Sequence, residues 1–270
     1  MRAVGLHPDV VVVTSRVFQT TCTLVRAGAA GGAGAEAFAI DSPVLPDELE
    51  LVPAIAQQAG FGVVGCLVTH GDWDHLLGRY AFPDAPLGVP ESTAARLRNE
   101  PGAAQRELRA FDDEHYVERP GPLSLGRPET TQALPVPGHC GIGERELELH
   151  PADGHTEDGM AVWIPWARVL VCGDYLSPVE IPWISEHGSA TAYLATLRRL
   201  APLVEQADHV VPGHGAVLDG TRAAAILGED VAYLEALLER GADAPLPLAR
   251  RSGAQRRIHA ENVGRVAAAA

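Results

Sequence analysis

Short apolar runs recur along the chain, and each has the length of a β-strand. Val, Ile, Leu and Thr dominate these runs, and turn-forming residues separate them. They predict strands at residues 9–14, 23–26, 37–41, 62–69, 146–150, 161–164, 169–172 and 210–211. The run at 62–69 is apolar almost throughout, which is typical of a strand that is buried on both faces.

Longer segments between these runs have the spacing and the end signals of helices. The segment 46–58 carries Asp47 and Glu48 in its first turn, and Gly60 stands just past its end. Two later segments repeat apolar residues in the way that is typical of an amphipathic helix. The sequence predicts helices at residues 46–58, 92–99, 191–200 and 221–240.

The segments that connect these elements are rich in turn-forming residues. The glycine- and alanine-rich stretch 27–35 predicts a hairpin loop. The proline-rich stretch 82–137 predicts loops and edge strands around the helix at 92–99. No repeat and no break in composition divides the chain. We therefore expect one α/β domain over residues 1–270, with residues 241–270 as a C-terminal tail or helical extension.

The charged residues narrow the range of partners. The 270 residues include 35 Asp and Glu against 21 basic residues, so the formal net charge is −14, and every basic residue is Arg. The absence of lysine excludes a Schiff-base nucleophile. A strongly acidic chain is also a poor match for a nucleic-acid backbone, which is bound by clustered cations. We therefore expect a small-molecule substrate and no nucleic-acid partner.

Neither membrane insertion nor disulfide chemistry is indicated by the sequence. No apolar stretch is long enough to span a bilayer, and the run Val10–Val13 is too short for the hydrophobic part of an export signal. The cysteines at positions 22, 66, 140 and 172 are scattered and form no C-x-x-C pair. This pattern is typical of reduced, mostly buried thiols. These features predict a cytoplasmic protein with no membrane partner.

The densest group of polar residues is the segment 69–75, which reads T-H-G-D-W-D-H and directly follows the apolar run at 62–69. His70, Asp72, Asp74 and His75 place four potential metal ligands within six residues. Positions 70, 72 and 74 alternate and can face one side of an extended turn, whereas position 75 diverges from its neighbour. The loop can therefore serve two metals, and its imidazole and carboxylate groups suit Zn, Mn or Fe.

Three further segments place a His or an Asp in a glycine-containing turn beside a predicted strand. They are Asp153-Gly154-His155-Thr156, Cys172-Gly173-Asp174 and Pro212-Gly213-His214-Gly215. Glycine lets the backbone bend tightly while the ligand side chain projects from the end of the strand. Each segment is a candidate to complete the metal site.

Together the segments resemble the metallo-β-lactamase-fold superfamily of metal-dependent hydrolases, with a ligand set similar to that of glyoxalase II and the lactonases. The signature of that family runs H-x-H-x-D-H, then a G-H-T turn, an Asp after a strand, and a P-G-H-G-like turn. The resemblance covers the chain from about residue 10 to residue 240 and implies a four-layer αββα sandwich. It also implies two metal sites: His70, Asp72 and His155 would bind one cation, Asp74, His75 and His214 would bind the other, and Asp174 would bridge both.

The chain departs from this signature at one position, because Asp72 stands where the family has its second His. A carboxylate oxygen also binds zinc, but it makes the first site harder and more anionic, which favours Fe or Mn. Flavodiiron proteins, which share the fold, have an acidic residue at this position and hold two irons. We expect two divalent cations, with zinc preferred and Fe or Mn as alternatives.

The resemblance implies a hydrolase in which a hydroxide held by two metals cleaves an ester, lactone, thioester or amide bond of a small molecule. Asp74 and Asp174 would hold the nucleophile and move its proton, so no Ser or Cys nucleophile is needed. Phosphoesters are less expected for so acidic a chain. Two alternatives stay open: an iron-dependent oxidoreductase of the sulfur-dioxygenase or flavodiiron type, and a non-catalytic metal-binding protein.

Aromatic residues near the motifs are candidates to line the substrate pocket. Phe18, Trp73, Tyr175 and Trp183 flank the ligand segments, and Tyr175 directly follows Asp174. Tyr175 either donates a hydrogen bond to a developing oxyanion or packs in the core with a satisfied hydroxyl.

Three other features have competing interpretations. Cys172 either supports the site from its strand or packs as a buried thiol. His139 lies in a G-H-C segment that resembles the G-H-T turn, but its distance along the chain from Asp174 is too large, so we expect a loop residue outside the site. A C-terminal group of arginines either meets an anionic substrate or forms a solvated helix face. These are Arg250, Arg251, Arg256 and Arg257.

Overall fold

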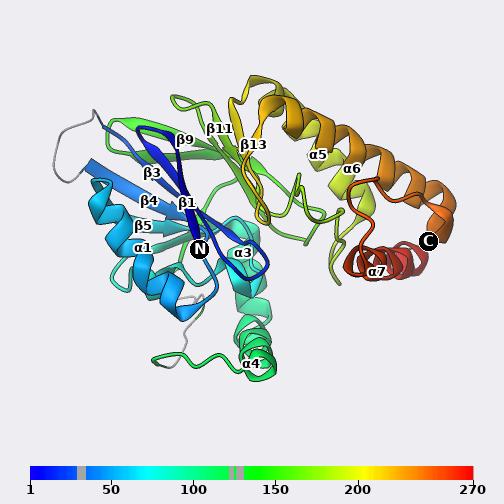
Figure 1. The fold of residues 1–270 in the computed structure, drawn as a ribbon, viewed down its shortest axis with the longest axis horizontal. Helices are drawn as coiled ribbons and strands as arrows, with labels where there is room; N and C mark the ends of the chain where they lie inside the picture. Colours follow the sequence, from blue (N-terminus) through cyan, green and yellow to red (C-terminus); the bar gives the residue numbers. More distant parts are fainter. Residues whose placement is uncertain (29–34, 122–124, 126–130, 270) are drawn as a thin grey trace.

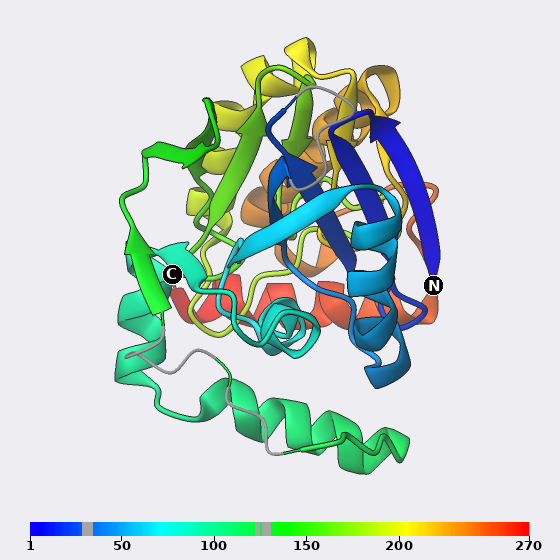
Figure 2. The same ribbon diagram turned by 90° about the vertical axis from the view of Figure 1, so that its left-hand side faces the viewer.

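Two β-sheets face each other in the computed structural model, which describes residues 1–28, 35–121, 125 and 131–269, and helices cover their outer faces (Figures 1 and 2). Helix α1 (Pro46–Gln58) lies against the outer face of the first sheet, and α5 (Ala190–Gln206) and α6 (Gly220–Arg240) lie along the second. The four-layer αββα sandwich predicted from the sequence is therefore confirmed.

The first sheet changes from antiparallel to parallel pairing halfway across. Its order is β1-β2-β3-β4-β5-β6-β7, with antiparallel pairs up to β4 and parallel pairs from β4 onwards. Its strands are β1 (Arg2–His7), β2 (Val10–Thr14), β3 (Thr21–Arg26), β4 (Ala35–Ile40), β5 (Phe61–Leu67), β6 (Leu87–Pro90) and β7 (Thr131–Leu134). Because parallel strands end at one edge of a sheet, the loops after β4 and β5 emerge side by side.

The second sheet has the order β13-β12-β11-β10-β9-β8. Its strands are β8 (Gly138–Ile142), β9 (Arg145–Pro151), β10 (Met160–Ile164), β11 (Val169–Val171), β12 (His209–Val211) and β13 (Leu218–Asp219). All its pairs are antiparallel except β11 with β12, which the crossover helix α5 connects. The loops after β11 and β12 therefore also end next to each other.

The helices begin where the sequence supplies suitable caps. Ser189 accepts a hydrogen bond from the backbone N–H of Ala192 at the start of α5, and Asp219 does the same for Arg222 at the start of α6. All four predicted helices are confirmed, and α1 has the predicted bounds. In the part of the chain that the structure describes, the other helical elements are α2 (Gly78–Ala81), α3 (Glu91–Asn99), α4 (Ala103–His115), α7 (Gly253–Ala269) and the 3₁₀ turns η1 (Trp73–His75) and η3 (Gly241–Asp243).

Three apolar clusters separate the four layers. Val12 and Val162 belong to the cluster between the two sheets. Leu49 and Leu108 belong to the cluster under the helices of the first sheet, and Leu197 belongs to the one under α5 and α6. Burying one such aliphatic side chain contributes about 1.5–3 kcal/mol, so these layers form a firm frame for the loops at the sheet edges.

The stretch 82–137 is more regular than predicted. It contains α4, where we expected loops, and β6 is an inner strand rather than an edge strand. The α4 sequence is highly charged, but Leu108 and Phe111 lie on one face, are buried and pack against the first sheet's helical layer. Tertiary packing of a narrow apolar stripe therefore decides this helix.

Two further expectations are limited by the structure. Only the second half of β5 is buried on both faces, because the Val64 side chain in its first half is 46% exposed. Most of the loop predicted at 27–35 lies outside the described residues. None of the helices in the described part of the chain is both long and apolar enough to cross a bilayer.

Candidate metal centre

Four of the predicted ligands leave the first sheet through one loop. The loop follows β5 and passes into the 3₁₀ turn η1, which contains Asp74 and His75. His70, Asp74 and His75 are buried, and Asp72 is partly buried. The second sheet supplies the other three: His155 precedes β10, Asp174 follows β11 and His214 follows β12. The structure thus brings together all seven predicted site residues.

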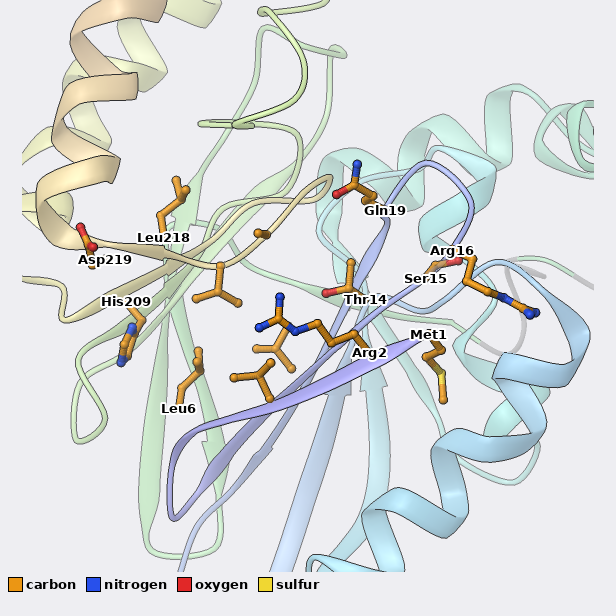
Figure 3. A pocket seen from close by; sticks show the side chains of 14 residues that line it. Met1, Arg2, Leu6, Thr14, Ser15, Arg16, Gln19, His209, Leu218 and Asp219 are labelled. Atoms are coloured by element: carbon orange, nitrogen blue, oxygen red, sulfur yellow. The ribbon is translucent and has the colours of Figure 1, made fainter. Parts of the chain in front are cut away.

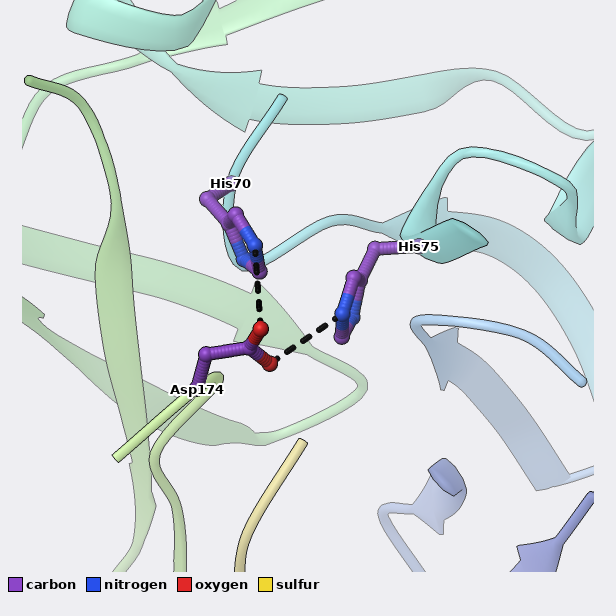
Figure 4. Close-up of side chains that lie close together, drawn as sticks. All are labelled: His70, His75 and Asp174. Atoms are coloured by element: carbon purple, nitrogen blue, oxygen red, sulfur yellow. Dashed lines mark ion pairs between the residues drawn. The ribbon is translucent and has the colours of Figure 1, made fainter. Parts of the chain in front are cut away.

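Asp174 lies at the centre of four imidazole rings. Its Oδ2 is 3.8 Å from Nε2 of His70, 3.3 Å from Nε2 of His155 and 3.2 Å from Nε2 of His214. Its Oδ1 is 3.2 Å from Nε2 of His75. Figure 4 shows the carboxylate pointing between His70 and His75. One carboxylate therefore faces ligand atoms from both sheets.

The other two carboxylates divide the histidines into two groups. Oδ2 of Asp72 is 3.3 Å from Nε2 of His155 and 3.7 Å from Nε2 of His70. Oδ2 of Asp74 is 3.6 Å from Nε2 of His214 and 3.8 Å from Nε2 of His75. Within each group the ligand atoms lie close enough to surround one metal ion. The division matches the two ligand sets implied by the sequence.

The second nitrogen of two rings is held by a backbone carbonyl outside the cluster. Nδ1 of His155 donates to the carbonyl of Trp183 at 2.9 Å, and Nδ1 of His214 donates to the carbonyl of Phe18 at 3.1 Å. A carbonyl only accepts, so these bonds place a proton on Nδ1 and turn the lone pair of Nε2 toward the cluster. This is the tautomer that a metal-binding histidine needs.

Asp41 organises the β5 loop from the end of the neighbouring strand β4. Its Oδ2 is 3.1 Å from Nδ1 of His75, and it accepts hydrogen bonds from the backbone N–H and the hydroxyl of Thr69, each at 2.8 Å. The Thr69 hydroxyl lies 3.1 Å from Nδ1 of His70. Asp41 has a φ of 58°, a conformation that is uncommon for a residue other than glycine. A strained backbone thus carries a carboxylate that orients two of the candidate ligands.

Arg96 on α3 balances the charge of Asp72. Its Nη1 lies 2.8 Å from Oδ1 of Asp72 and 2.9 Å from Oδ1 of Asp158. Asp158 is buried and also accepts hydrogen bonds from the Gly71 N–H and the Thr93 hydroxyl. The outer oxygen of Asp72 is therefore occupied, and the other oxygen faces His155.

Two glycine turns allow the close approach of these loops. A Cβ at Gly213 would collide with Oδ1 of Asp174, and a Cβ at Gly154 would collide with the backbone of Tyr193. Gly154 also has a φ of 125°, which side chains rarely adopt. The glycines in the ligand motifs therefore serve packing as well as turning.

The charges of the cluster stabilise one another. Burial alone would lower the pKa of His155 and His214. The hydrogen bond with Asp72 and the charge of Asp174 instead raise the pKa of His155 to about 9. The charge of Asp174 is the main cause that raises the pKa of His214 to about 10. Burial would raise the pKa of Asp174, yet the neighbouring imidazoles hold it well below its usual range. The metal-free cluster therefore holds protons where a cation would replace them.

The donor set fits divalent cations. Among the described residues, Nε2 of His70, Nε2 of His75 and Oδ1 of Asp174 are buried without a hydrogen-bond partner. Buried polar atoms without partners are costly, so they indicate a missing ligand. Nitrogen and carboxylate donors are those that Zn, Mn and Fe prefer.

Several expectations outside the ligand set are settled by the structure. Tyr175 is buried, and its hydroxyl donates to the carbonyl of Asp153 and accepts from the His155 N–H, so its suggested oxyanion role is wrong and core packing is confirmed. Cys172 packs as a buried thiol that donates hydrogen bonds to the Tyr175 and Val211 carbonyls, and burial raises its pKa well above the usual value.

The decoy histidine and the arginine group also differ in detail from the predictions. His139 stays outside the cluster as expected, but it is an exposed residue of β8 rather than a loop residue. Arg250 is buried and paired with Asp230 at 2.6 Å, so it belongs neither to a solvated face nor to a substrate site. Arg251, Arg256 and Arg257 are exposed.

Aromatic rings stand at two sides of the cluster. The exposed Phe18 ring packs edge-on against His214 and Trp73, and the exposed Trp183 ring packs against His155. A small crevice beside the cluster is lined by His155, Asp174, Trp183 and Glu180, among others, and burial raises the pKa of this glutamate. No motif in the sequence marks Glu180, Arg96 or Asp158, whereas Asp41 carries a weak signal as an acid at the end of an apolar run.

A much larger hollow than this crevice lies elsewhere on the surface. A cavity of about 510 Å³ opens between the β1–β2 hairpin and the β12–β13 edge and is lined by residues that include Arg2, Thr14, His209 and Asp219 (Figure 3). It contains none of the seven candidate ligands, so size alone does not identify the functional site.

Comparisons with solved structures agree with this fold. The DIM-1 metallo-beta-lactamase exposed to ceftazidime has a TM-score of 0.57 and 18% identity, over 84% of this chain and 96% of that one. A metallo-beta-lactamase family protein from Thermus thermophilus has a TM-score of 0.66 and 20% identity, over 97% and 93%. The sec-alkylsulfatase Pisa1 from Pseudomonas sp. has a TM-score of 0.71 and 13% identity, over 98% of this chain and 49% of its own.

Sequence comparison identifies the family. A comparison with curated proteins finds no match. The family model for the metallo-beta-lactamase superfamily matches residues 16–214, a span that contains all seven candidate ligands and ends at His214. The chain therefore belongs to the metallo-beta-lactamase superfamily.

Proposed function

We propose that the seven-residue cluster holds two divalent cations and that the protein is a hydrolase of ester, lactone, thioester or amide bonds in small molecules. One observation carries the proposal: four imidazoles from both sheets converge on Asp174, Asp72 and Asp74 each face two of these rings, and two of the rings have their outer nitrogens held by carbonyls. Such an arrangement has no structural use that would offset the cost of burying so many polar groups.

The residues divide between the two cations as the distances suggest. His70, Asp72 and His155 would hold one, Asp74, His75 and His214 would hold the other, and Asp174 would bridge them. When bound, the cations would supply an activated water as nucleophile and polarise the scissile carbonyl.

The chain's own residues would then accept the proton of the water and contact the substrate. The carboxylates of Asp74 and Asp174 are the acceptors for the proton that water releases during attack. The Thr20 hydroxyl donates to Oδ2 of Asp74 at 3.3 Å and fixes its orientation. Phe18 and Trp183 provide apolar surface beside the cluster, which suits the carbon skeleton of an uncharged substrate.

Metal analysis combined with a substrate panel tests the proposal. Protein purified without added metal is expected to carry about two transition-metal ions per chain and to hydrolyse at least one of a chromogenic ester, lactone, thioester or amide. His214→Ala should lose metal and more than about 100-fold in activity, because even outer partners of ligands are worth 10–100-fold. His139→Ala, which changes an exposed histidine of β8, is the matched control. A preparation that never binds metal would contradict the proposal.

A second candidate, an iron-dependent oxidoreductase, is favoured by Asp72 alone. An oxygen ligand in place of nitrogen shifts the first site toward harder metals. Bound iron with oxygen consumption and no hydrolysis would support this candidate over the first. Asp72→His should then shift the metal preference toward zinc.

A further inference from the structure

The loop between β11 and α5 joins the candidate metal centre to the C-terminal helix. It follows Asp174 and contains Trp183, whose carbonyl accepts the Nδ1 hydrogen bond of His155 at 2.9 Å. The Trp183 ring also packs against the His155 ring, with 5.4 Å between centroids. The orientation of His155 thus depends on the position of Trp183.

Side chains of α7 hold this loop by its backbone. Oδ1 of Asn262 accepts from the Ile184 N–H at 2.8 Å, and its Nδ2 donates to the Pro182 carbonyl at 2.6 Å. Oε1 of Gln255 accepts from the Ile181 N–H at 2.8 Å. Pro182 and Ile184 are the two neighbours of Trp183, so Asn262 brackets the residue that orients His155.

The burial pattern of α7 shows that these contacts are specific. Asn262 is 0% and Gln255 is 5% exposed, and they are the buried residues of a helix that is otherwise largely exposed. Their seven-residue separation places them on one face, two turns apart. Partly buried Ile258, Val263 and Val266 pack α7 against the apolar cluster under α5 and α6. The two buried amides add directional hydrogen bonds, which fix the position of the loop more tightly than apolar contact does.

Two further contacts strengthen the same attachment. Glu261 accepts from the Trp183 indole Nε1 at 3.0 Å. Just before α7, the buried Arg250 donates to the Glu180 carbonyl at 2.7 Å and to the Ser177 carbonyl at 3.1 Å, and Asp230 on α6 balances its charge. Residues 177–184 of the loop are therefore held by the C-terminal segment, which comprises Arg250 and the helix α7.

We propose that the C-terminal segment is part of the metal centre, with Asn262 as a positioning residue that sets the orientation of His155 through Trp183. The segment acts on the group of His70, Asp72 and His155, because the loop bonds to the His155 ring, whereas His75 and His214 of the other group are held by Asp41 and by the Phe18 carbonyl. The predicted effect on metal affinity rests on the proposed function, whereas the predicted effect on the orientation of His155 does not.

Asn262→Ala tests the proposal in two forms of the protein. In the metal-loaded form, cobalt titration against a competing chelator should show a loss of about 10–100-fold in affinity at one of two sites, with the other unchanged. The visible spectrum of the His155 site should change accordingly. Arg257→Ala, an exposed change on the same helix, should alter neither site.

The metal-free form supplies a readout that needs no bound metal. The Nδ1 proton of His155 should exchange with solvent faster in Asn262→Ala than in the parent, while that of His214 should not change, because a different loop holds it. If Asn262→Ala does not fold, Gln255→Ala removes one bond only and should give a smaller effect in the same direction. Equal proton exchange at His155 in the parent and the variants, or equal loss at both metal sites, would overturn the proposal. A parent that binds no cobalt would instead contradict the proposed function.

Discussion

Asp72 carries a negative charge that a neutral histidine at its position would not carry, and Arg96 offsets part of that charge. The Arg96 guanidinium lies against one oxygen of Asp72, while the other oxygen stays directed at His155. Arg96 also pairs with the buried Asp158, so its removal would leave Asp158 without a cation and Asp72 with the neighbouring imidazoles alone. An unpaired buried charge costs several kcal/mol.

Arg96→Gln should therefore destabilise the metal-free protein more than the metal-loaded protein. We expect the free energy of unfolding to fall by about 2–4 kcal/mol without metal, and by less when a cation faces Asp72. Urea unfolding with a chelator and with saturating zinc measures both values. Arg98→Gln, an exposed change on the same helix, is the control. Equal losses of unfolding free energy in the two forms would show that Arg96 stabilises the fold and has no specific role at the metal site.

At the residue scale, the sequence predicted the ligands but not the residues that support them. The ligands could be recognised because each lies in a short motif with a fixed spacing. Arg96 and Asp158 lie 62 positions apart and meet only in the folded chain, so no local pattern marks them. Tyr175 was ambiguous for a related reason, because its neighbour Asp174 faces the cluster while the Tyr175 ring packs in the core.

At the element scale, the site depends on how closely the turns after β11 and β12 approach each other. These strands are parallel neighbours, so their following turns meet at the same edge. Gly213 lies where the second turn passes Asp174, and there is no space there for a Cβ. The turn thus limits the position of the central carboxylate.

Gly213→Ala is expected to displace Asp174 and to weaken both metal sites. The added methyl group would also cost about 1–3 kcal/mol through overpacking. Gly228→Ala is the matched control, because Gly228 lies on α6 with open space around it and alanine should raise stability by about 0.5–1 kcal/mol there. Metal content and thermal unfolding of the two variants check the expectation. Full metal occupancy in Gly213→Ala would contradict it.

Elements with strong local signals were predicted best. The bounds of α1 follow from acidic residues in its first turn and a glycine after its end. The helix α4 was missed because its two buried residues, Leu108 and Phe111, are too few to stand out in a charged segment. The C-terminal helix was expected in outline, but its docking by Gln255 and Asn262 depends on a loop 74 to 78 residues away and has no local signature.

At the scale of the whole molecule, the absence of lysine lets the titration of the histidines appear in the pH dependence of the free energy of unfolding. The net charge is −14 and there is no lysine, so no lysine titrates as the pH rises above neutrality. Burial raises the pKa of the Cys66 thiol to about 12 and that of Cys22 further. Buried thiols reduce stability only above about pH 9, and they do so whether or not metal is bound.

The metal-free protein should lose stability as the pH rises from about 7 to about 10. His155 and His214 have pKa values of about 9 and about 10 when folded, above the value of 6.5 expected for the unfolded chain. The folded state therefore binds more protons in this range, and the free energy of unfolding falls with pH, by about 3 kcal/mol or more in total. Bound cations replace these protons, so the metal-loaded protein should show only the smaller loss due to the thiols. Urea unfolding at several pH values across this range, with chelator and with zinc, measures the difference, and parallel curves would mean that the histidines do not hold these protons.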